Sequence, residues 1–263
     1  TGLDICSSCR DKYRIKIMPL KFLDSTGSGR TSDAIRAIYY AVDNGAQVIN
    51  CSWGGGSYSR SLLDAMTYAY DHQVIVVTAA GNNATNNDVS PMYPAGYDVP
   101  SNLSVAASTD TDSLASFSNY GASSVPVAAP GYYIYSTYPG NSYTLMSGTS
   151  MAAPFVAGLA AYAWREAPQL TGYQIKQLIM STVNTKAAFA GKTSTQGRVN
   201  AYNLITQAQS SGSILASQPV YKADYSQADL ASSAAGSTGG CGLVKGIGGG
   251  RGGSSGGGFE GFA

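Results

Sequence analysis

The chain has 263 residues, 44% of them hydrophobic, and this length suits one α/β domain with a tail. Only 12% of the residues are charged and the formal net charge is +1, so the charge gives no indication of a nucleic-acid partner. The hydrophobic fraction predicts a folded core rather than disorder. No apolar stretch approaches the roughly 20 residues that a membrane helix needs, so we expect no membrane partner.

The first part of the chain combines strand and helix patterns. Residues 14–23, RIKIMPLKFL, predict a strand, and the GSG at 27–29 predicts a turn. A helix is expected next, because apolar residues recur at i, i+3, i+4 and i+7: Ile35, Ile38, Tyr39 and Val42. One of residues 31–33 (TSD) is expected to cap this helix, and Gly45 to end it.

A second strand and helix follow directly. Residues 48–52 form a short run with β-branched residues that predicts a strand, and it is followed by WGGG. A helix with Leu62, Met66 and Ala69 on one side is expected next. It leads to a predicted strand at 74–78, which is followed by AAGN. Strands alternating with helices at this spacing predict a parallel sheet with right-handed crossovers. Ligands of such sheets bind outside the carboxyl ends of the strands. The segments GSG, SWGGG and AAGN are therefore expected to line one edge.

Later patterns complete one domain. LSVAAS and VPVAAP predict further strands, and a helix that is apolar on nearly all sides, and so buried, begins near Ser150. A surface helix opened by TGYQ is striped by Ile175, Leu178, Ile179 and Thr182, and another is expected around residues 199–208. We assign 1–210 to the domain, 211–235 to a linker and 236–263 to a flexible Gly/Ser-rich tail.

The cysteines and the glycine tail offer weaker signals. Cys6, Cys9, Cys51 and Cys241 permit two disulfides, and the CxxC of the first two also permits a zinc or redox site. Zinc prefers a second pair, which is lacking, so we expect a local disulfide or plain thiols, with Cys51 buried in the core. The GxGxxG at residues 248–253 has no strand before it and no helix after it, which argues against a dinucleotide site.

The most informative string is GTSMAAP, residues 148–154. A serine in the first turn of a buried helix has a backbone N–H without an intrahelical acceptor, beside the positive end of the helix dipole. That placement suits a nucleophile whose attack creates an oxyanion. Taken by itself, Ser150 is better interpreted as a helix cap.

The motifs together resemble a known family. GTSMAAPFVAG resembles the nucleophile motif of the subtilases, SWGGG their substrate-binding strand end, AAGN their oxyanion-asparagine motif, and ASFSNYG with VAAPG the segment before the nucleophile. Order and spacing agree over roughly residues 2–204. The resemblance implies a serine endopeptidase acting on extended polypeptides. It also implies a three-layer, doubly wound, mostly parallel sheet, here without its N-terminal strand and histidine-bearing helix.

Site residues follow from the resemblance, position by position. Ser150 corresponds to the nucleophile, and the Asn82 side chain joins the Ser150 N–H in holding the oxyanion. Residues expected to pair with the peptide backbone or to form a pocket wall are Ser52, Trp53 and Gly54 on one side, Gly27, Ser28 and Gly29 on the other, and Ala79, Ala80 and Gly81 as the wall. Trp53 departs from the smaller aliphatic residue usual in the family, which bears on subsite shape.

The general base has no candidate in this sequence. A serine hydroxyl needs a base within roughly 3 Å, and the only histidine, His72, precedes the strand 74–78 while Asn82 follows it, about 17 Å away at 3.3 Å per residue. The DTG and HGTH motifs of subtilases are absent, and TGLD at 1–4 matches the segment after the histidine helix. We therefore expect the chain alone to be nearly inactive.

Two interpretations compete for this gap. The chain is either part of an active protease, with a missing N-terminal segment or prodomain as a partner, or a noncatalytic peptide-binding pseudoprotease. We favour the former, since a pseudoenzyme more often changes a side chain than loses a central strand and a buried helix. A nucleotide-binding Rossmann protein ranks third, because GSGRTS lacks a third glycine and a P-loop lysine.

Cofactors and location are less specified. We expect no cofactor and assign no metal ligand, although calcium is often bound in the family. A surface poor in Lys and Glu and rich in Ser, Thr, Asn and Tyr is common in secreted proteins. We expect an extracellular or cell-surface location, with any export signal outside this chain.

Overall fold

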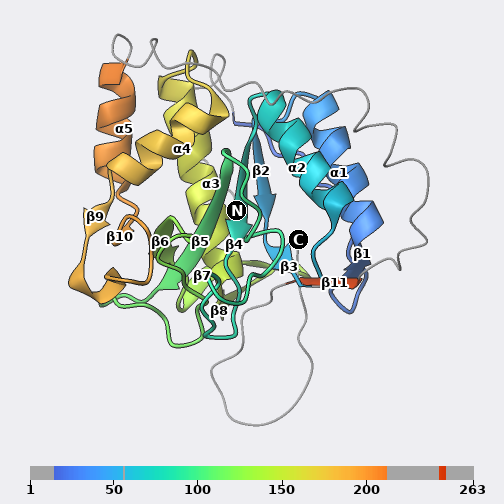
Figure 1. Cartoon of the computed structure of the whole chain (residues 1–263), viewed down its shortest axis with the longest axis horizontal. Coiled ribbons are helices and arrows are strands. Elements are labelled where there is room, and N and C mark those ends of the chain that lie inside the picture. Colours follow the sequence, from blue (N-terminus) through green and yellow to red (C-terminus); the bar gives the residue numbers. More distant parts are fainter. Residues whose placement is uncertain (1–14, 56, 212–242, 247–263) are drawn as a thin grey trace.

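The computed structural model describes residues 15–55, 57–211 and 243–246. A six-stranded sheet forms its centre, in the order β2-β4-β5-β6-β10-β9 (Figure 1). The strands are β2 (Val48–Cys51), β4 (Ile75–Ala79), β5 (Asn102–Ser108), β6 (Val127–Pro130), β10 (Gly197–Arg198) and β9 (Asn184–Thr185). Every pair is parallel except β10 with β9, which confirms the predicted mostly parallel sheet.

Helices cover both faces of this sheet, as Figure 1 shows. They are α1 (Thr31–Asp43), α2 (Arg60–Asp71), α3 (Thr149–Glu166), α4 (Gly172–Ser181), α5 (Ala201–Ser210) and the 3-10 turn η1 (Ala187–Phe189). Strand β4 shows how the layers are divided, because successive side chains of a strand point to opposite faces. Ile75 and Val77 pack in the core formed with α3, α4 and α5, whereas Val76 packs in the core formed with α1 and α2. The three-layer α/β/α fold is therefore confirmed.

Two smaller sheets lie outside the central one. Strands β7 (Ile134–Tyr138) and β8 (Ser142–Met146) form a hairpin. Strands β1 (Ser28–Arg30), β11 (Leu243–Gly246) and β3 (Trp53–Gly54) form a three-stranded sheet, with β11 in the middle. The tail assigned to 236–263 thus contains a strand where we expected flexible chain.

Two local predictions were wrong. The predicted strand 14–23 is not formed in its described part, because residues 15–23 make no ladder with any described strand, although the outer edge of β2 has no described partner. The cap of α1 is Arg30, not one of residues 31–33, because β1 runs directly into the helix and leaves Arg30 extended at the junction.

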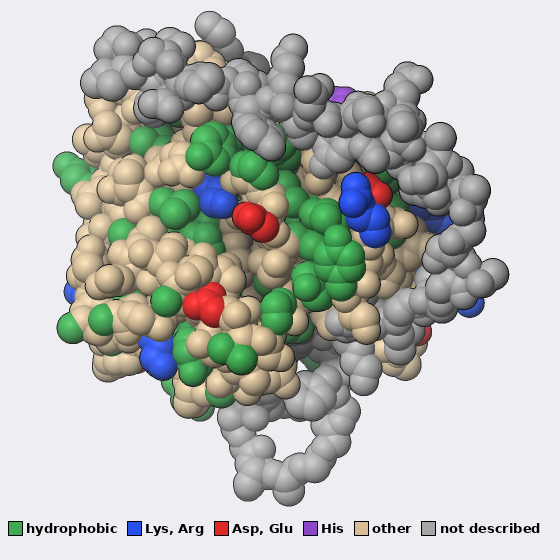
Figure 2. Space-filling model, in the orientation of Figure 1, with side chains coloured by type: hydrophobic (Ala, Val, Ile, Leu, Met, Phe, Trp, Pro, Cys, Tyr) green, Lys and Arg blue, Asp and Glu red, His purple; other side chains and the backbone are tan. Residues whose placement is uncertain are grey.

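The remaining helices agree with their sequence signals. Ser59 caps α2 by accepting the Leu62 N–H, and Thr171 opens α4 in a capping box with Gln174. Much of α3 is buried, as its apolar sequence predicted. No helix of the described ranges is long and apolar enough to cross a membrane. Charged side chains are sparse on the face shown in Figure 2, in keeping with the composition.

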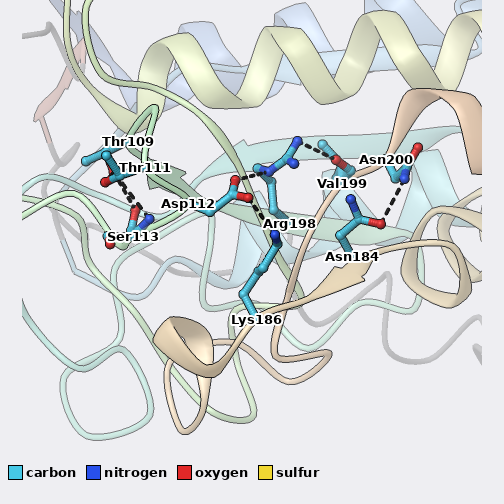
Figure 3. A network of polar contacts seen from close by, with 9 residues as sticks. All are labelled: Thr109, Thr111, Asp112, Ser113, Asn184, Lys186, Arg198, Val199 and Asn200. Atoms are coloured by element: carbon cyan, nitrogen blue, oxygen red, sulfur yellow. Dashed lines mark hydrogen bonds and ion pairs between the residues drawn. The ribbon is translucent and has the colours of Figure 1, made fainter.

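An ion-pair network joins the loop after β5 to the far edge of the sheet (Figure 3). The Asp112 carboxylate forms ion pairs with Lys186 Nζ at 2.8 Å and with Arg198 Nε at 2.5 Å, so it links the loop to β10 and to the residue after β9. The ion pair with Lys186, which has the larger effect, and that with Arg198 hold the pKa of the Asp112 carboxyl below its usual value. This stabilisation is present above the unfolded-state pKa and is lost as the pH falls through the lowered folded-state pKa.

We expect Asp112→Asn to reduce the free energy of unfolding by up to about 1 kcal/mol at neutral pH, since the pair is partly exposed. The difference between variant and parent should shrink as the pH falls below about 4, where the parent carboxyl also becomes neutral. Urea unfolding at several pH values measures this. An undiminished difference at low pH would contradict the assignment, and Asp110→Asn, two residues away, serves as the control.

Candidate active site

The beginning of α3 presents Ser150 at the carboxyl ends of the parallel strands. Thr149 and Ser150 are its first two residues, and Gly148 precedes them in an extended conformation. The N–H groups of a first turn have no acceptor within their helix and carry the positive end of its dipole. Ser150 is only 4% exposed, so this polar helix end is largely shielded from solvent.

Ser150 is bound to the end of β2 by two reciprocal hydrogen bonds. Its hydroxyl donates to the Ser52 carbonyl at 3.3 Å, and the Ser52 hydroxyl donates to the Ser150 carbonyl at 2.9 Å. The helix and the SWGGG segment are 98 positions apart in the chain, yet they meet at this point. The structure therefore brings Ser52 and Ser150 together, as the strand-end argument predicted.

Asn82 lies beside the same helix end. Its side-chain oxygen accepts hydrogen bonds from the Thr149 N–H at 2.9 Å and from the Thr149 hydroxyl at 2.8 Å. The Thr149 hydroxyl in turn accepts the Gly81 N–H at 3.1 Å. With its oxygen bound on this side, the amide is fixed in rotation and its nitrogen faces away from Thr149.

Thr149 is a site residue that the sequence reasoning missed. It is fully buried, and it connects the AAGN loop to the beginning of α3 through its hydroxyl and its N–H. The signal was the hydroxyl residue directly before Ser150, in a string whose next residues are apolar. We identify Thr149 as a positioning residue for Asn82.

The AAGN loop leaves β4 in a conformation that requires glycine. Gly81 has φ of +114°, and a Cβ there would lie 2.3 Å from the Met92 sulfur and 2.5 Å from the Asn119 amide nitrogen. The Ala79 and Ala80 side chains are buried in the core. Any pocket wall made by these residues is therefore formed by their backbone.

The two segments expected to hold a peptide lie on either side of β11. Ser28 and Gly29 belong to β1, preceded by Gly27 at φ +72°, and Trp53 and Gly54 form β3. Both strands pair with β11 in antiparallel register. We call the facing backbone edges of β1 and β3 the peptide edges.

Trp53 contributes its side chain to the core rather than to the peptide edges. It is 5% exposed, and its ring meets Phe22 edge to face at 5.3 Å. Gly29 also packs tightly against Phe22, because a Cβ at position 29 would lie 2.8 Å from the Phe22 carbonyl oxygen. Aromatic packing therefore fixes β3, and the lack of a side chain at Gly29 lets β1 approach residues 22–23.

An Asp-centred turn positions β1. The Asp24 carboxylate accepts hydrogen bonds from the Thr26 hydroxyl at 2.7 Å, the Thr26 N–H at 2.8 Å and the Ser28 N–H at 3.1 Å. These hydrogen bonds lower the pKa of the Asp24 carboxyl, and the bond from the Thr26 hydroxyl has the largest effect. The turn is thus held by a charged carboxylate at neutral pH.

His72 lies elsewhere. It is the C-cap of α2, where its Nδ1 lies 2.8 Å from the Tyr68 carbonyl and its ring packs 4.0 Å from the Tyr68 ring. The chain enters β4 from this end and leaves it at the other end, toward Asn82. The structure therefore keeps the single histidine away from Ser150, as expected.

Of the four cysteines, only Cys51 lies among the described residues. Cys51 is a free, buried thiol whose pKa burial raises to about 12, which confirms its expected place in the core. Cys6, Cys9, Cys241 and the glycines of 248–253 lie outside the described residues. Within the described ranges, no group of three or more His, Cys, Asp or Glu side chains could hold a metal ion.

Comparison with known proteins decides the family. The sequence matches the family described as "Subtilase family" over residues 11–239. The chain belongs to the subtilase family. Similar subtilases include the "Thermophilic serine proteinase" of Bacillus sp. (strain AK1), 43% identical over 191 residues, and "Thermitase" of Thermoactinomyces vulgaris, 42% identical over 193 residues. "Subtilisin DY" of Bacillus licheniformis is 42% identical over 169 residues.

These matches cover more of this chain than of its relatives. The match to the AK1 proteinase includes 73% of this chain and 45% of that protein. The match to thermitase includes 73% of this chain and 66% of thermitase, and the match to subtilisin DY includes 64% of this chain and 61% of subtilisin DY. The subtilase fold is also seen in solved structures. A protease from Pseudoalteromonas arctica PAMC 21717 matches with a TM-score of 0.62 at 33% identity, covering 68% of this chain and 59% of that one. A cold-adapted subtilisin-like serine proteinase matches with a TM-score of 0.59 at 36% sequence identity, and the match covers 68% of this chain and 63% of that one.

Proposed function

We propose that this chain carries the nucleophile and the oxyanion-binding half of a serine endopeptidase. Ser150 attacks a peptide carbonyl of an extended polypeptide, and the acyl group is transferred to its oxygen as the amine leaves; water then hydrolyses the ester. The Asn82 amide and the Ser150 N–H stabilise the tetrahedral oxyanion. The observation that carries the proposal is the double hydrogen bond from Thr149 that fixes Asn82 beside the nucleophile.

The peptide edges supply the binding part of the proposal. An extended substrate satisfies its backbone N–H and C=O groups by adding a strand between β1 and β3, and side chains then adjust specificity. Ser52 joins β3 to the nucleophile through its carbonyl, so a peptide bound along β3 ends at Ser150. Polypeptide is accordingly the proposed substrate.

The proton of Ser150 needs an acceptor that the described residues do not provide. The hydroxyl donates to the Ser52 carbonyl, which holds it in place but cannot take up a proton at neutral pH. We propose that an Asp/His pair from polypeptide outside these 263 residues is the general base. Trapping an acyl-enzyme on Ser150 by mass spectrometry, in a protein that includes the upstream sequence, tests this function directly.

The second candidate is a noncatalytic peptide-binding protein. It is favoured by one observation: both peptide edges are formed and paired in a chain whose only histidine is bound at the far end of β4. The reading frame upstream of residue 1 separates the candidates. A sequence with DTG and HGTH motifs supports the protease, and one without them supports the binding protein.

The N-terminal partner can be argued from the open side of the sheet. Ile17 is 71% exposed and Met18 is 40% exposed, both in the segment that was expected to be a strand. In β2, the strand at the end of the central sheet, Asn50 is also exposed. Among the described residues only β4 pairs with β2. We propose that an N-terminal segment or prodomain covers this apolar segment. The charge-poor surface supports an extracellular or cell-surface location for the assembly.

We expect the chain alone to self-associate through this segment, since exposed apolar side chains and an open strand edge both promote association. Light scattering after size exclusion should show oligomers whose fraction falls in the double variant Ile17→Ser/Met18→Ser. Tyr202→Ser, which removes another exposed side chain on α5, is the matched control and should change nothing. A monodisperse, cooperatively melting parent chain would argue against the proposal.

A further inference from the structure

Strand β11 joins β1 and β3 into one sheet, although it comes from the C-terminal end of the chain (Figure 1). It is antiparallel to both neighbours. The paired residues are Arg30 with Leu243, Gly29 with Val244, Ser28 with Lys245, Gly54 with Lys245 and Trp53 with Gly246. The segment Leu243–Gly246 therefore lies between the two peptide edges.

The pairing uses the backbone groups that a substrate would need. A strand inserted between two others directs alternate N–H and C=O groups to each neighbour, so β11 engages both peptide edges at once. A second extended peptide cannot pair with the same groups while β11 is in place. Occupation by the tail and binding of a polypeptide along these edges are thus mutually exclusive.

The direction of β11 is also the one that a substrate needs. The part of a substrate before the cleaved bond runs, from its N-terminal to its C-terminal side, toward the carbonyl that Ser150 attacks. Along β11 the partner on β3 moves from Gly54 to Trp53, that is, toward Ser52. The Ser52 carbonyl accepts the Ser150 hydroxyl at 3.3 Å. Strand β11 ends at Gly246, one register position short of Ser52, and so points its carboxyl-terminal end at the nucleophile.

We propose that the C-terminal segment Leu243–Gly246 is a built-in competitive ligand of the peptide edges, which it occupies in the manner of a substrate and thereby blocks. The inference rests on the proposed function, because it assigns a regulator to the same binding edges. No covalent step is involved, and release of the tail restores the edges. A short strand in a small sheet is suited to such exchange.

The strength of the block follows from the tether. A segment linked within the same chain acts at an effective concentration on the order of 1 mM. If a free peptide of the same sequence binds with a Kd of about 100 μM, the tethered copy lowers the apparent affinity of an added peptide about tenfold. The tail is therefore displaceable by abundant substrate.

The test compares peptide binding by the full chain with that of the double variant Val244→Pro/Lys245→Pro. Successive N–H groups of a central strand face opposite neighbours, so this pair removes one donor toward β1 and one toward β3. The probe is a fluorescein-labelled peptide, Gly-Leu-Val-Lys-Gly, followed by anisotropy. The matched control is Ser254→Pro/Ser255→Pro, two prolines placed elsewhere in the tail. All three proteins are compared at a concentration at which size exclusion shows monomers.

We expect the β11 variant to bind the probe about tenfold more tightly than the parent, and the control to match the parent. Hydrogen exchange at the amides of β1 should be slow in the parent and faster in the β11 variant. Equal, measurable affinity in all three proteins overturns the inference but leaves the proposed peptide edges intact. Absence of binding in all three, with normal melting curves, overturns both. Fast exchange in the parent likewise overturns the inference.

Discussion

A chromogenic peptide should be hydrolysed about a million-fold more slowly by this chain than by a protein that adds an Asp/His base to it. About this loss of rate is known for subtilisin when its catalytic histidine is removed. The physical reason is that the Ser150 hydroxyl donates to the Ser52 carbonyl, and that the part of the chain that the structure describes places no group beside it that can accept its proton.

Steady-state hydrolysis by the chain, by the longer protein and by Ser150→Ala in each background makes the comparison. The longer protein should lose nearly all activity on Ser150→Ala, whereas the chain should stay at its already negligible rate. The matched control is Ser147→Ala, which removes a hydroxyl just before the nucleophile helix that binds the Tyr133 N–H instead. Rapid cleavage by the chain alone that disappears with Ser150→Ala would refute the account of the missing base.

Removing the Asn82 amide should lower kcat of the longer protein by about 100- to 1000-fold with little change in KM. That magnitude is again the one known for subtilisin, because an oxyanion donor acts mainly in the transition state. Thr149→Val should lower kcat by roughly tenfold, the rate equivalent of one hydrogen bond of about 1.4 kcal/mol, since it frees the Asn82 oxygen from one of its two donors on Thr149.

Thr149→Ser is the matched control, because it keeps the hydroxyl and should retain most of the activity. The double variant Asn82→Ala/Thr149→Val shows whether Thr149 only positions the Asn82 side chain or contributes to kcat in another way. If Thr149 acts only through Asn82, the double variant should be no slower than Asn82→Ala alone. An unchanged kcat in Asn82→Ala, or additive losses in the double variant, would contradict the assigned roles.

Much of the domain could be predicted because its signals are local. The apolar stripe of α4 and its Thr171 cap are both readable in one short segment, and the buried runs of β4 and β5 are bounded by turn residues. The strand-end rule then placed Ser52 and Asn82 at one edge without any knowledge of side chains. The motif at residues 148–154 placed Ser150 there as well.

The failures have a common physical cause, which is dependence on a distant partner. Residues 15–23 have strand composition, but a strand exists only where its backbone pairs with another strand, and this segment pairs with no described strand. The Gly-rich tail has little strand propensity, yet Leu243–Gly246 forms β11 because two open edges are available to it. Thr149 was overlooked since its role depends on Asn82, 67 positions away in the chain.

The most direct test is a crystal structure of the longer protein after Ser150 has reacted with a peptidyl phosphonate. The account predicts a phosphoryl oxygen about 3 Å from both the Asn82 side-chain nitrogen and the Ser150 backbone nitrogen, with His72 still at the end of α2. An adduct oxygen turned away from Asn82, or the His72 ring beside the modified serine, would contradict it.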